Sequence, residues 1–437
     1  MTNSKLKDSN IEWLGKIPRD WKVKPLYLFF FERKNKNNKG KEKNLLSLSY
    51  GKIIQKDINS TGGLLPQSYN TYNVIEAGDI IIRPTDLQND KHSLRTALSK
   101  EHGIITSAYI DLAPLKDTNS EYFHYVLHAY DIEKVFYNMG NGVRQGLNYS
   151  EFSKLKLPIP SSEEQKEIVN FLNNQVSQID KLSKKIQQEI TDLEEYRKSI
   201  ITKAVTKGID KNVPIKNSGD KMIGEIAASF KLVPLKYVAN YNLHTLSDDT
   251  NPDFCFKYID IGSVTTGHIN KYQKLRFADA PSRARRLVKN NDIIISTVRT
   301  YLKAIAFIQD LQKTTVVSTG FIVLSPKKNL IDPVYLRYAI ENESFISKVQ
   351  AYSVGITYPA INSSTIMNFK LVYPPFNAQK EIASYLDKKC KSINQIIEKK
   401  RTLINSLNQY KQSIIYEYVT GKKQVSSEEG VKAWEVL

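Results

Sequence analysis

The sequence has very little cysteine and no long hydrophobic run. Its 437 residues include only two cysteines, Cys255 and Cys390, so we expect neither a disulfide framework nor a cysteine-based metal cluster. The longest apolar run near the start, Leu26–Phe31, is much too short to span a membrane. The polar residues before it do not form the apolar core of a signal peptide. These absences predict a cytoplasmic protein that makes no membrane contact.

Motifs for catalysis are also missing. The sequence contains no Walker motif, no glycine-rich turn between a strand and a helix, and no zinc-ligand spacing, and its six histidines are scattered. The tetrapeptide at Tyr373–Phe376, YPPF, is faintly similar to the [N/D]PP[Y/F] loop of amino-methyltransferases. Its first residue differs from that pattern, and no cofactor-binding glycine motif accompanies it. We therefore interpret it as the entry to a helix and expect a chain without catalytic activity.

Positive charge is abundant. The net charge is +18 and the isoelectric point is near 9.4, which favours an acidic partner, with nucleic acid first. Residues 1–162 contain 23 basic and 17 acidic side chains, and residues 208–376 contain 21 and 13. The positive excess therefore lies mainly in two long segments of irregular pattern.

The chain contains an internal repeat, in which one sequence unit occurs twice. GDIII at Gly78–Ile82 has a counterpart in NDIII at Asn291–Ile295, and QKEI at Gln165–Ile168 recurs at Gln379–Ile382. The opening segment recurs as well: Ser9, Gly15, Ile17, Lys22, Pro25 and Leu26 return as Ser218, Gly224, Ile226, Lys231, Pro234 and Leu235. The repeat spans almost the whole chain, which predicts two domains of the same architecture.

Each copy ends in a long stretch with a heptad pattern. Apolar residues spaced by seven, with Lys400 as a polar exception, predict a coiled-coil seam. Its core would consist of Leu172, Ile179, Ile186, Leu193 and Ile200 in the first helix and of Leu386, Ile393, Leu407 and Ile414 in the second. A helix of this length has to pair with another, and the chain offers one partner. We therefore expect the two helices to form an antiparallel coiled coil.

The remaining segments mix short β-branched runs with two helical patterns. Runs such as DIIIRP and DIIISTV predict strands, whereas residues 120–138 and 332–350 each predict a helix preceded by a capping residue. We predict an α+β protein in which two α/β domains, related by a pseudo-two-fold axis, are joined by the two long helices. The expected boundaries are 1–160, 161–208 (helix), 209–375, 376–422 (helix) and a tail at 423–437.

Together these features resemble the specificity subunit of type I restriction-modification systems. The opening KDSNIEWLGKIPRDWKVKPL, the GDIII strand, the PIPSSEEQKEI helix entry and PSRARRLVKNNDIIISTVRTYLKAIAFI carry the resemblance. The second copy of WLGKIP departs from the family and reads MIGEIA. The family order is also present: target-recognition domain, spacer helix, target-recognition domain, spacer helix.

The resemblance implies a subunit that selects DNA sequences for other proteins. Each target-recognition domain would bind one half of an asymmetric bipartite site in double-stranded DNA. The partners would be two methyltransferase subunits and restriction subunits that translocate and cleave DNA. S-adenosylmethionine, ATP and Mg would be bound by those partners, and this chain would need no cofactor.

Side chains suited to DNA gather in the loops that follow the predicted strands. Arginine, glutamine and asparagine read base edges in the major groove, while lysine and tyrosine contact phosphates. The first-domain candidates are Arg83, Gln88, Lys91, Arg95, Arg144, Gln145, Asn148 and Tyr149. The second-domain candidates are Arg283, Arg285, Arg286, Arg299, Tyr301, Lys303, Thr357 and Tyr358. The lysine-rich segment 33–43 is open to two interpretations, a phosphate contact or a solvated loop.

Two alternatives remain open on the sequence alone. An enzyme, such as a fused or degenerate methyltransferase or nuclease, would act without partners. A coiled-coil scaffold would bind acidic proteins and show no DNA sequence preference and little dependence on salt.

Overall fold

The computed structural model describes residues 6–59, 68–85, 87, 94–137, 139, 146–210, 212–311 and 313–425. The chain divides into two compact units. Unit 1 comprises residues 1–186 and 402–437, and unit 2 comprises residues 187–401. Among the described residues, no helix is both long and apolar enough to cross a membrane.

Unit 1 is built on a four-stranded antiparallel sheet with the order β4-β11-β8-β9. The helix α1 packs on β9. Its strands and helices before the long helix are β1 (Leu6–Asp8), β2 (Lys16–Pro18), β3 (Lys22–Pro25), β4 (Phe30–Glu32), β5 (Leu46–Ser49), β6 (Lys52–Gln55), β7 (Asn73–Ile75), β8 (Ile80–Ile82), β9 (Thr96–Leu98), β10 (Gly103–Ile105), β11 (Ile110–Pro114), α1 (Ser120–Ile132), α2 (Tyr149–Phe152) and β12 (Lys156–Ile159).

Unit 2 repeats this sheet as β16-β25-β22-β23 and adds a second one with the order β20-β17-β24-β21. Within the added sheet, β17 and β24 are parallel. Its elements between the long helices are β13 (Ile215–Asn217), β14 (Glu225–Ala227), β15 (Lys231–Pro234), α4 (Leu235–Val238), β16 (Ala239–Tyr241), β17 (Cys255–Ile259), β18 (Val264–Thr265), β19 (His268–Ile269), β20 (Gln273–Arg276), β21 (Ala284–Val288), β22 (Ile293–Ser296), β23 (Ile305–Phe307), β24 (Thr315–Ser318), β25 (Phe321–Pro326), α5 (Pro333–Glu341), α6 (Glu343–Ala351), α7 (Ser363–Met367) and β26 (Lys370–Tyr373).

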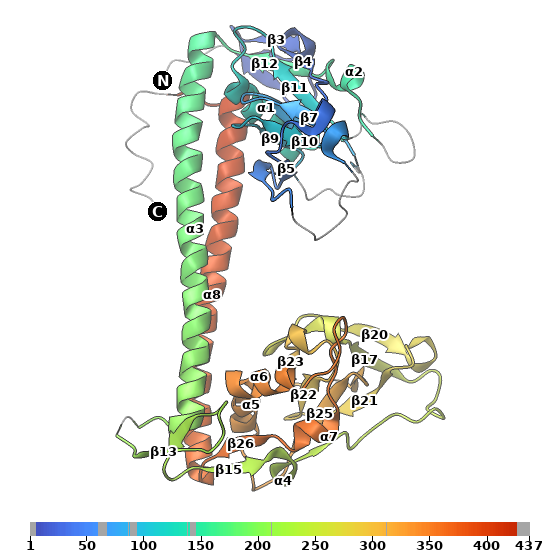
Figure 1. The fold of residues 1–437 in the computed structure, drawn as a ribbon, viewed down its shortest axis with the longest axis vertical. Coiled ribbons are helices and arrows are strands. Elements are labelled where there is room, and N and C mark those ends of the chain that lie inside the picture. The colour runs from blue at the N-terminus through green and yellow to red at the C-terminus, as the bar shows by residue number, and fades with distance from the viewer. Residues whose placement is uncertain are drawn as a thin grey trace. The chain divides into compact units, whose positions relative to one another are not determined.

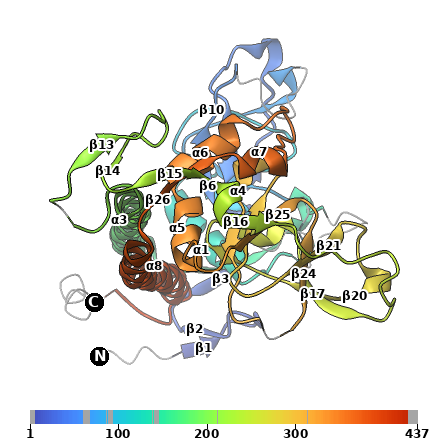
Figure 2. The ribbon, with the colours of Figure 1, turned by 90° about the horizontal axis from the view of Figure 1, so that it is seen from below.

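The repeat in the sequence corresponds to a repeat in the structure. The hairpin β1–β2 recurs as β13–β14, and the pair β3–β12 recurs as β15–β26. The β13–β14 hairpin lies beside the end of α3 (Figures 1 and 2), where Lys207 forms an ion pair with Glu225 at 2.9 Å. The α+β class with two repeated domains is therefore confirmed.

One predicted helix is in fact two. The segment 332–350 was expected to be a single helix, but Asn342 has an extended backbone that separates α5 from α6. The Asn342 side chain accepts a hydrogen bond from the backbone N–H of Ser344 at 2.9 Å, as an N-cap does. Because this local bond satisfies the start of α6, the chain turns at residue 342.

The two long helices are α3 (Ser162–Lys207) and α8 (Phe376–Val419). Both begin with the same contact, because the buried side chains of Gln165 and Gln379 donate to the carbonyls of Pro160 and Pro374 at 3.2 and 2.9 Å. The YPPF segment therefore serves as a helix entry. The C-terminal helix ends three residues before the predicted limit, and Gly421 follows with φ +68°. A Cβ there would lie 2.3 Å from Pro18, so this position requires glycine.

The long helices run antiparallel in each unit (Figure 1). In unit 1, Asp180 of α3 contacts Lys411 of α8 at 2.6 Å. In unit 2, the polar core residue Lys400 pairs with Glu189 at 2.5 Å. The predicted core residues Leu172, Ile179, Ile186, Leu386, Ile393, Leu407 and Ile414 are buried, whereas Leu193 and Ile200 are half-buried. Each of the two long helices contributes one part to each unit.

Candidate nucleic-acid interface

The best-formed candidate surface lies in unit 2, where the chain leaves β22. Arg299 and Lys303 flank a short 3₁₀ turn, and both have a left-handed backbone, with φ of 51° and 50°. Non-glycine residues adopt this conformation only at an energetic cost, and such residues cluster at functional sites. The turn exposes Arg299 and leaves 52% of Tyr301 accessible. Lys303 is half-buried and lies 3.3 Å from Glu343.

A second predicted loop packs against this turn. Val354 and Ala360 exchange two backbone hydrogen bonds of 2.8 and 2.9 Å, which close the intervening residues into a narrow ribbon. The backbone N–H of Ile361 donates to the carbonyl of Thr297 at 2.8 Å, directly after β22. The structure therefore brings together two loops that lie about sixty residues apart in the sequence.

The two loops share an exposed arginine–aromatic contact. The Arg299 guanidinium lies 5.0 Å from the centre of the Tyr358 ring. Tyr358 is 62% exposed, and the neighbouring Thr357 is exposed as well. An arginine stacked on an aromatic ring is held in place while its N–H edge still faces outward. This arrangement suits a contact with a base edge or a phosphate.

The three arginines of residues 283–286 lie elsewhere in unit 2. They were expected in a loop, but Arg285 and Arg286 belong to strand β21 of the added sheet. Arg283 precedes this strand, is exposed, and donates to the Tyr258 hydroxyl at 3.2 Å. Arg285 lies 4.7 Å from the centre of the Phe277 ring and 3.3 Å from Asp248.

Arg286 has a structural position. Its guanidinium donates to the carbonyl of Phe321 at 2.6 Å and so joins β21 to β25 of the other sheet. Burial lowers the pKa of Arg286 from its ordinary value. This side chain is half-buried and hydrogen-bonded inside the unit, and its contact with DNA stays a prediction.

Unit 1 repeats the connection between the two loops. The backbone N–H of Leu147 donates to the carbonyl of Pro84 at 3.0 Å, as Ile361 donates to Thr297 in unit 2. Arg83 directly follows β8 and is half-buried. The predicted residues Gln88, Lys91, Arg144 and Gln145 lie outside the described residues.

Three further unit 1 predictions concern residues with contacts inside the unit. Asn148 is exposed and caps α2, since its side chain accepts from the backbone N–H of Glu151 at 3.0 Å. Tyr149 is half-buried and donates to the carbonyl of Phe30 at 2.8 Å. Arg95 is completely buried, and its guanidinium donates to the Thr85 carbonyl. Arg95 therefore has an internal position in the described part of unit 1, and its contact with DNA stays a prediction.

The lysine-rich segment 33–43 is folded against the rest of unit 1. Arg33 forms two hydrogen bonds with the carboxylate of Asp79, at 2.9 and 3.1 Å. The buried Asn37 side chain donates to the carbonyl of Glu42 at 3.0 Å. The five lysines of the segment, at positions 34, 36, 39, 41 and 43, are exposed. The segment is thus an ordered turn, and the phosphate interpretation stays a prediction for these lysines.

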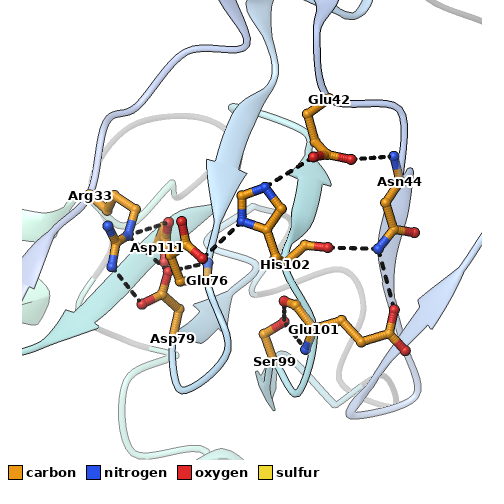
Figure 3. A network of polar contacts seen from close by, with 9 residues as sticks. All are labelled: Arg33, Glu42, Asn44, Glu76, Asp79, Ser99, Glu101, His102 and Asp111. Carbon is orange, nitrogen blue, oxygen red and sulfur yellow. Dashed lines mark hydrogen bonds and ion pairs between the residues drawn. The ribbon is translucent and has the colours of Figure 1, made fainter.

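A polar network that the sequence did not reveal surrounds Arg33 (Figure 3). Asp111 lies 3.8 Å from Arg33, and both Asp79 and Asp111 are almost completely buried. Burial, together with the nearby Asp79 charge, raises the pKa of Asp111 to about 8. On the other side, His102 lies between Glu42 and Glu76 at 3.0 and 2.8 Å, and the hydrogen bond to Glu76 raises the pKa of His102. The network thus joins Arg33, directly after β4, to Asp79 before β8 and to Asp111 of β11.

Sequence analysis also missed the apolar side chains of the unit 2 loops. Ile356 is completely exposed at the end of the ribbon, and 81% of Val354 and 40% of Leu302 are accessible. A signal was present, because VGITYP places apolar residues around a glycine where polar loop residues are usual. Large exposed apolar groups of this kind mark an interaction surface.

Comparison with known proteins identifies the family. The family model that matches this chain describes the type I restriction modification DNA specificity domain. It matches residues 18–192 and 247–406, which together make up more than half of the chain. The family resemblance predicted from the sequence is thereby confirmed.

Two relatives come from Methanocaldococcus jannaschii. The type I restriction enzyme MjaVIII specificity subunit is 26% identical over 297 residues, which cover 63% of this chain and 64% of that protein. The chain thus spans slightly less than two thirds of that relative. The provisionally named MjaX type I restriction enzyme specificity subunit is 24% identical over 433 residues, covering 95% of this chain and 96% of that protein.

A solved structure shows the same fold. It comes from work on complex assembly and conformational transition of the type I R-M system. The matching chain is 14% identical with a TM-score of 0.66, and the match covers 93% of this chain and 99% of that one. At this identity the likeness concerns the fold alone. By its match to the family model, this chain belongs to the family of type I restriction modification DNA specificity proteins.

Proposed function

We propose that this chain is the DNA-recognition subunit of a type I restriction-modification complex and that each unit binds one half of an asymmetric bipartite site. One observation carries the proposal. The main-chain link from Leu147 to Pro84 in unit 1 recurs from Ile361 to Thr297 in unit 2. In both units the link joins the loop after the central strand to the loop before a short helix. The two units thus share this main-chain link, but the sequences of the linked loops differ, as two half-sites of different sequence require.

Charge and exposure support the assignment. The chain carries a net charge of +18, which suits a polyanion. In unit 2 the linked loops present Arg299 beside Tyr358, with Thr357 exposed next to them. Arginine forms two hydrogen bonds with guanine, and tyrosine and threonine contact phosphates or sugars. We assign the base contact to Arg299 and supporting contacts to Tyr301, Thr357 and Tyr358.

The chemistry belongs to the partners in this proposal. Two methyltransferase subunits, with S-adenosylmethionine, would methylate adenine, and restriction subunits would use ATP and Mg to translocate and cleave DNA. The chain itself would select the sequence and catalyse nothing. The assignment to partners rests on family membership and agrees with the missing catalytic motifs of the sequence.

Selection from random DNA tests the proposal. The chain is purified in complex with its methyltransferase subunits and used to enrich duplexes from a random library at two salt concentrations. We expect a motif of two dissimilar halves at a fixed spacing, with binding that weakens steeply as salt rises. A complex that binds acidic proteins but enriches no sequence would instead support the scaffold alternative.

A further inference from the structure

The ribbon of unit 2 ends in an unusually apolar tip. Ile356 has a relative exposure of 102%, the highest among the large hydrophobic residues that the structure describes. Tyr358, two residues further on, is 62% exposed and carries the Arg299 contact. An exposed apolar side chain beside an exposed arginine–tyrosine contact points to an interaction surface.

Hydrogen bonds at the base of the ribbon fix the loop that carries this exposed tip. The hydrogen bonds between Val354 and Ala360 close the ribbon at its base. The Thr300 hydroxyl donates to the Ser353 hydroxyl at 2.8 Å and fastens the ribbon to the turn after β22. Gly355 has φ +115°, and a Cβ there would lie 3.2 Å from the Tyr358 carbonyl. Because only glycine suits this position, the turn that exposes Ile356 is specified by the sequence.

The neighbours of Ile356 favour DNA as the occupant. The exposed Arg299 lies on Tyr358 at 5.0 Å, so a cation stands beside the apolar tip. The major groove of B-DNA is wide enough for an α-helix or a two-stranded ribbon, and so for the short loop that one backbone bridge closes between Val354 and Ala360. The one apolar group on the floor of the groove is the C5 methyl of thymine. Phosphates line the rim of the groove, where the exposed Tyr301 can supply a supporting contact while Arg299 contacts a base edge. The combined apolar and cationic surface matches this groove.

We infer that Ile356 contacts a thymine methyl group in the major groove of the half-site bound by unit 2. This inference rests on the proposed function and names one base that unit 2 would recognise. Ile356 then determines specificity at one position through apolar contact alone, next to the position read by Arg299. Its role is to discriminate bases, since its side chain has no polar group for a phosphate.

The test uses the full chain in complex with its methyltransferase subunits and the bipartite duplex found by selection. Each thymine of the unit 2 half-site is replaced in turn by deoxyuridine, which lacks only the C5 methyl. We expect one replacement to weaken binding roughly fourfold, the effect of removing one buried methyl group. Ile356→Ala should weaken binding to the thymine duplex by a similar factor and should bind the thymine and deoxyuridine duplexes equally.

A matched variant controls for the loss of any exposed isoleucine. Ile215 lies on the β13–β14 hairpin of the same unit and is 49% exposed. Ile215→Ala should keep the full deoxyuridine effect. Because Ile356 makes no buried contact, Ile356→Ala should unfold at the same denaturant concentration as the natural chain, which excludes misfolding as the cause.

The outcomes separate this inference from the proposed function. If the natural complex prefers its selected duplex over a scrambled one, the proposed function stands whatever the thymine result is. A half-site without thymine, or an equal deoxyuridine effect in Ile356→Ala and the natural chain, would overturn the inference. Weaker binding by Ile356→Ala without any deoxyuridine effect would also overturn it, because Ile356 would then act as a wedge or a backbone contact.

Discussion

At the scale of single residues, the structure separates arginines that hold the fold from arginines that face solvent. Arg286 joins two sheets through the Phe321 carbonyl, and Arg95 is completely buried. Arg299 instead lies at the surface on Tyr358. In the sequence, all three are arginines near predicted strands. Their roles depend on distant residues that close around them, which spacing along the chain does not reveal.

Arg299→Ala tests the base contact directly. We expect binding of the selected duplex to weaken by about 1–3 kcal/mol and one position of the unit 2 half-site to become less selective. Binding measured against duplexes that carry each base at that position checks this result. Arg276→Ala is the comparison and should keep the motif, since Arg276 is exposed on β20 of the same unit and is not among the predicted DNA contacts. Equal affinity and an unchanged motif in Arg299→Ala would refute the assignment.

Asp111→Asn tests the buried network of unit 1. The pKa of Asp111 is raised to about 8 by burial and by Asp79, whereas the unfolded carboxyl has an ordinary value near 3.8. The folded state therefore favours the protonated form, and stability falls as pH rises from the unfolded pKa towards the folded one. Removing the charge should stabilise the protein by about 1–3 kcal/mol at pH near 8.

Urea denaturation at acidic and mildly alkaline pH measures this effect. The stability difference between Asp111→Asn and the natural chain should shrink as pH falls through the unfolded pKa near 3.8, because below it the carboxyl is protonated in both states. Arg33 keeps its two hydrogen bonds to Asp79 in the variant, so its charge remains paired. A variant that is less stable than the natural chain at pH near 8 would contradict this account.

At the scale of elements, α1 and α5 are equivalent helices with different surfaces. Tyr125 of α1 donates to Asn173 of α3, and Tyr338 of α5 donates to Asp387 of α8, both at 2.8 Å. In unit 2, Arg337 stands one residue before Tyr338 and Glu341 stands three residues after it, and their side chains pair at 3.0 Å. Unit 1 has two histidines there, His124 and His128. The repeat therefore offers a natural comparison of an ion pair with a histidine pair.

The histidine pair should make unit 1 sensitive to acid. Burial lowers the pKa of His124 to about 3 and that of His128 to about 4, and the nearby Lys100 and Lys411 add to the effect. The neutral rings are thus favoured in the folded state. Their cost to stability is absent above the unfolded pKa of 6.5 and grows as pH falls below it. We expect a loss of about 2 kcal/mol for each histidine between pH about 7 and 5, or about 4 kcal/mol for the pair.

Transplanting the unit 2 pair tests this prediction. The double variant H124R/H128E places the unit 2 side chains on α1, with the new glutamate near Lys411. Its stability should change less between pH about 7 and 5 than that of the natural chain, as measured by urea denaturation. Equal pH dependence in both proteins would show that other groups control the acid response.

Sequence periodicity predicted the long elements well and the short ones only in part. The heptads fixed α3, α8 and their antiparallel pairing, because a long apolar seam has few ways to be covered. The break at Asn342 was not predicted, since it depends on a single side-chain cap that competes with continuation of the helix. The added sheet of unit 2 escaped too, because β17 and β24 pair across more than fifty residues. Loop contacts such as Ile361 with Thr297 depend on the finished fold.

At the scale of the whole molecule, the chain repeats one backbone arrangement, a pair of linked loops, with different loop sequences in the two units. The long helices take part in both units, and each unit has its own pair of linked loops. If each unit reads half of the target, then specificity should be modular. The arrangement predicts that one unit can be exchanged while the other half of the target stays the same.

Exchange of residues 209–375 tests this modularity. The segment is replaced by the corresponding segment of a family member with a different target, and the hybrid is produced with the same methyltransferase subunits. Half of the enriched motif should change, and the other half should stay. The reciprocal hybrid should show the complementary pattern. A hybrid that loses both halves although it folds, or keeps both, would contradict the assignment of one half-site to each unit.

The most direct measurement of the central claim is a map of methylated adenines in a host without adenine methylation of its own. The host produces the partner methyltransferase subunits with and without this chain. We predict that a single asymmetric bipartite motif becomes methylated only when the chain is present. Methylation of the same motif without the chain, or of no motif when all subunits are present and assembled, would contradict a role in sequence recognition.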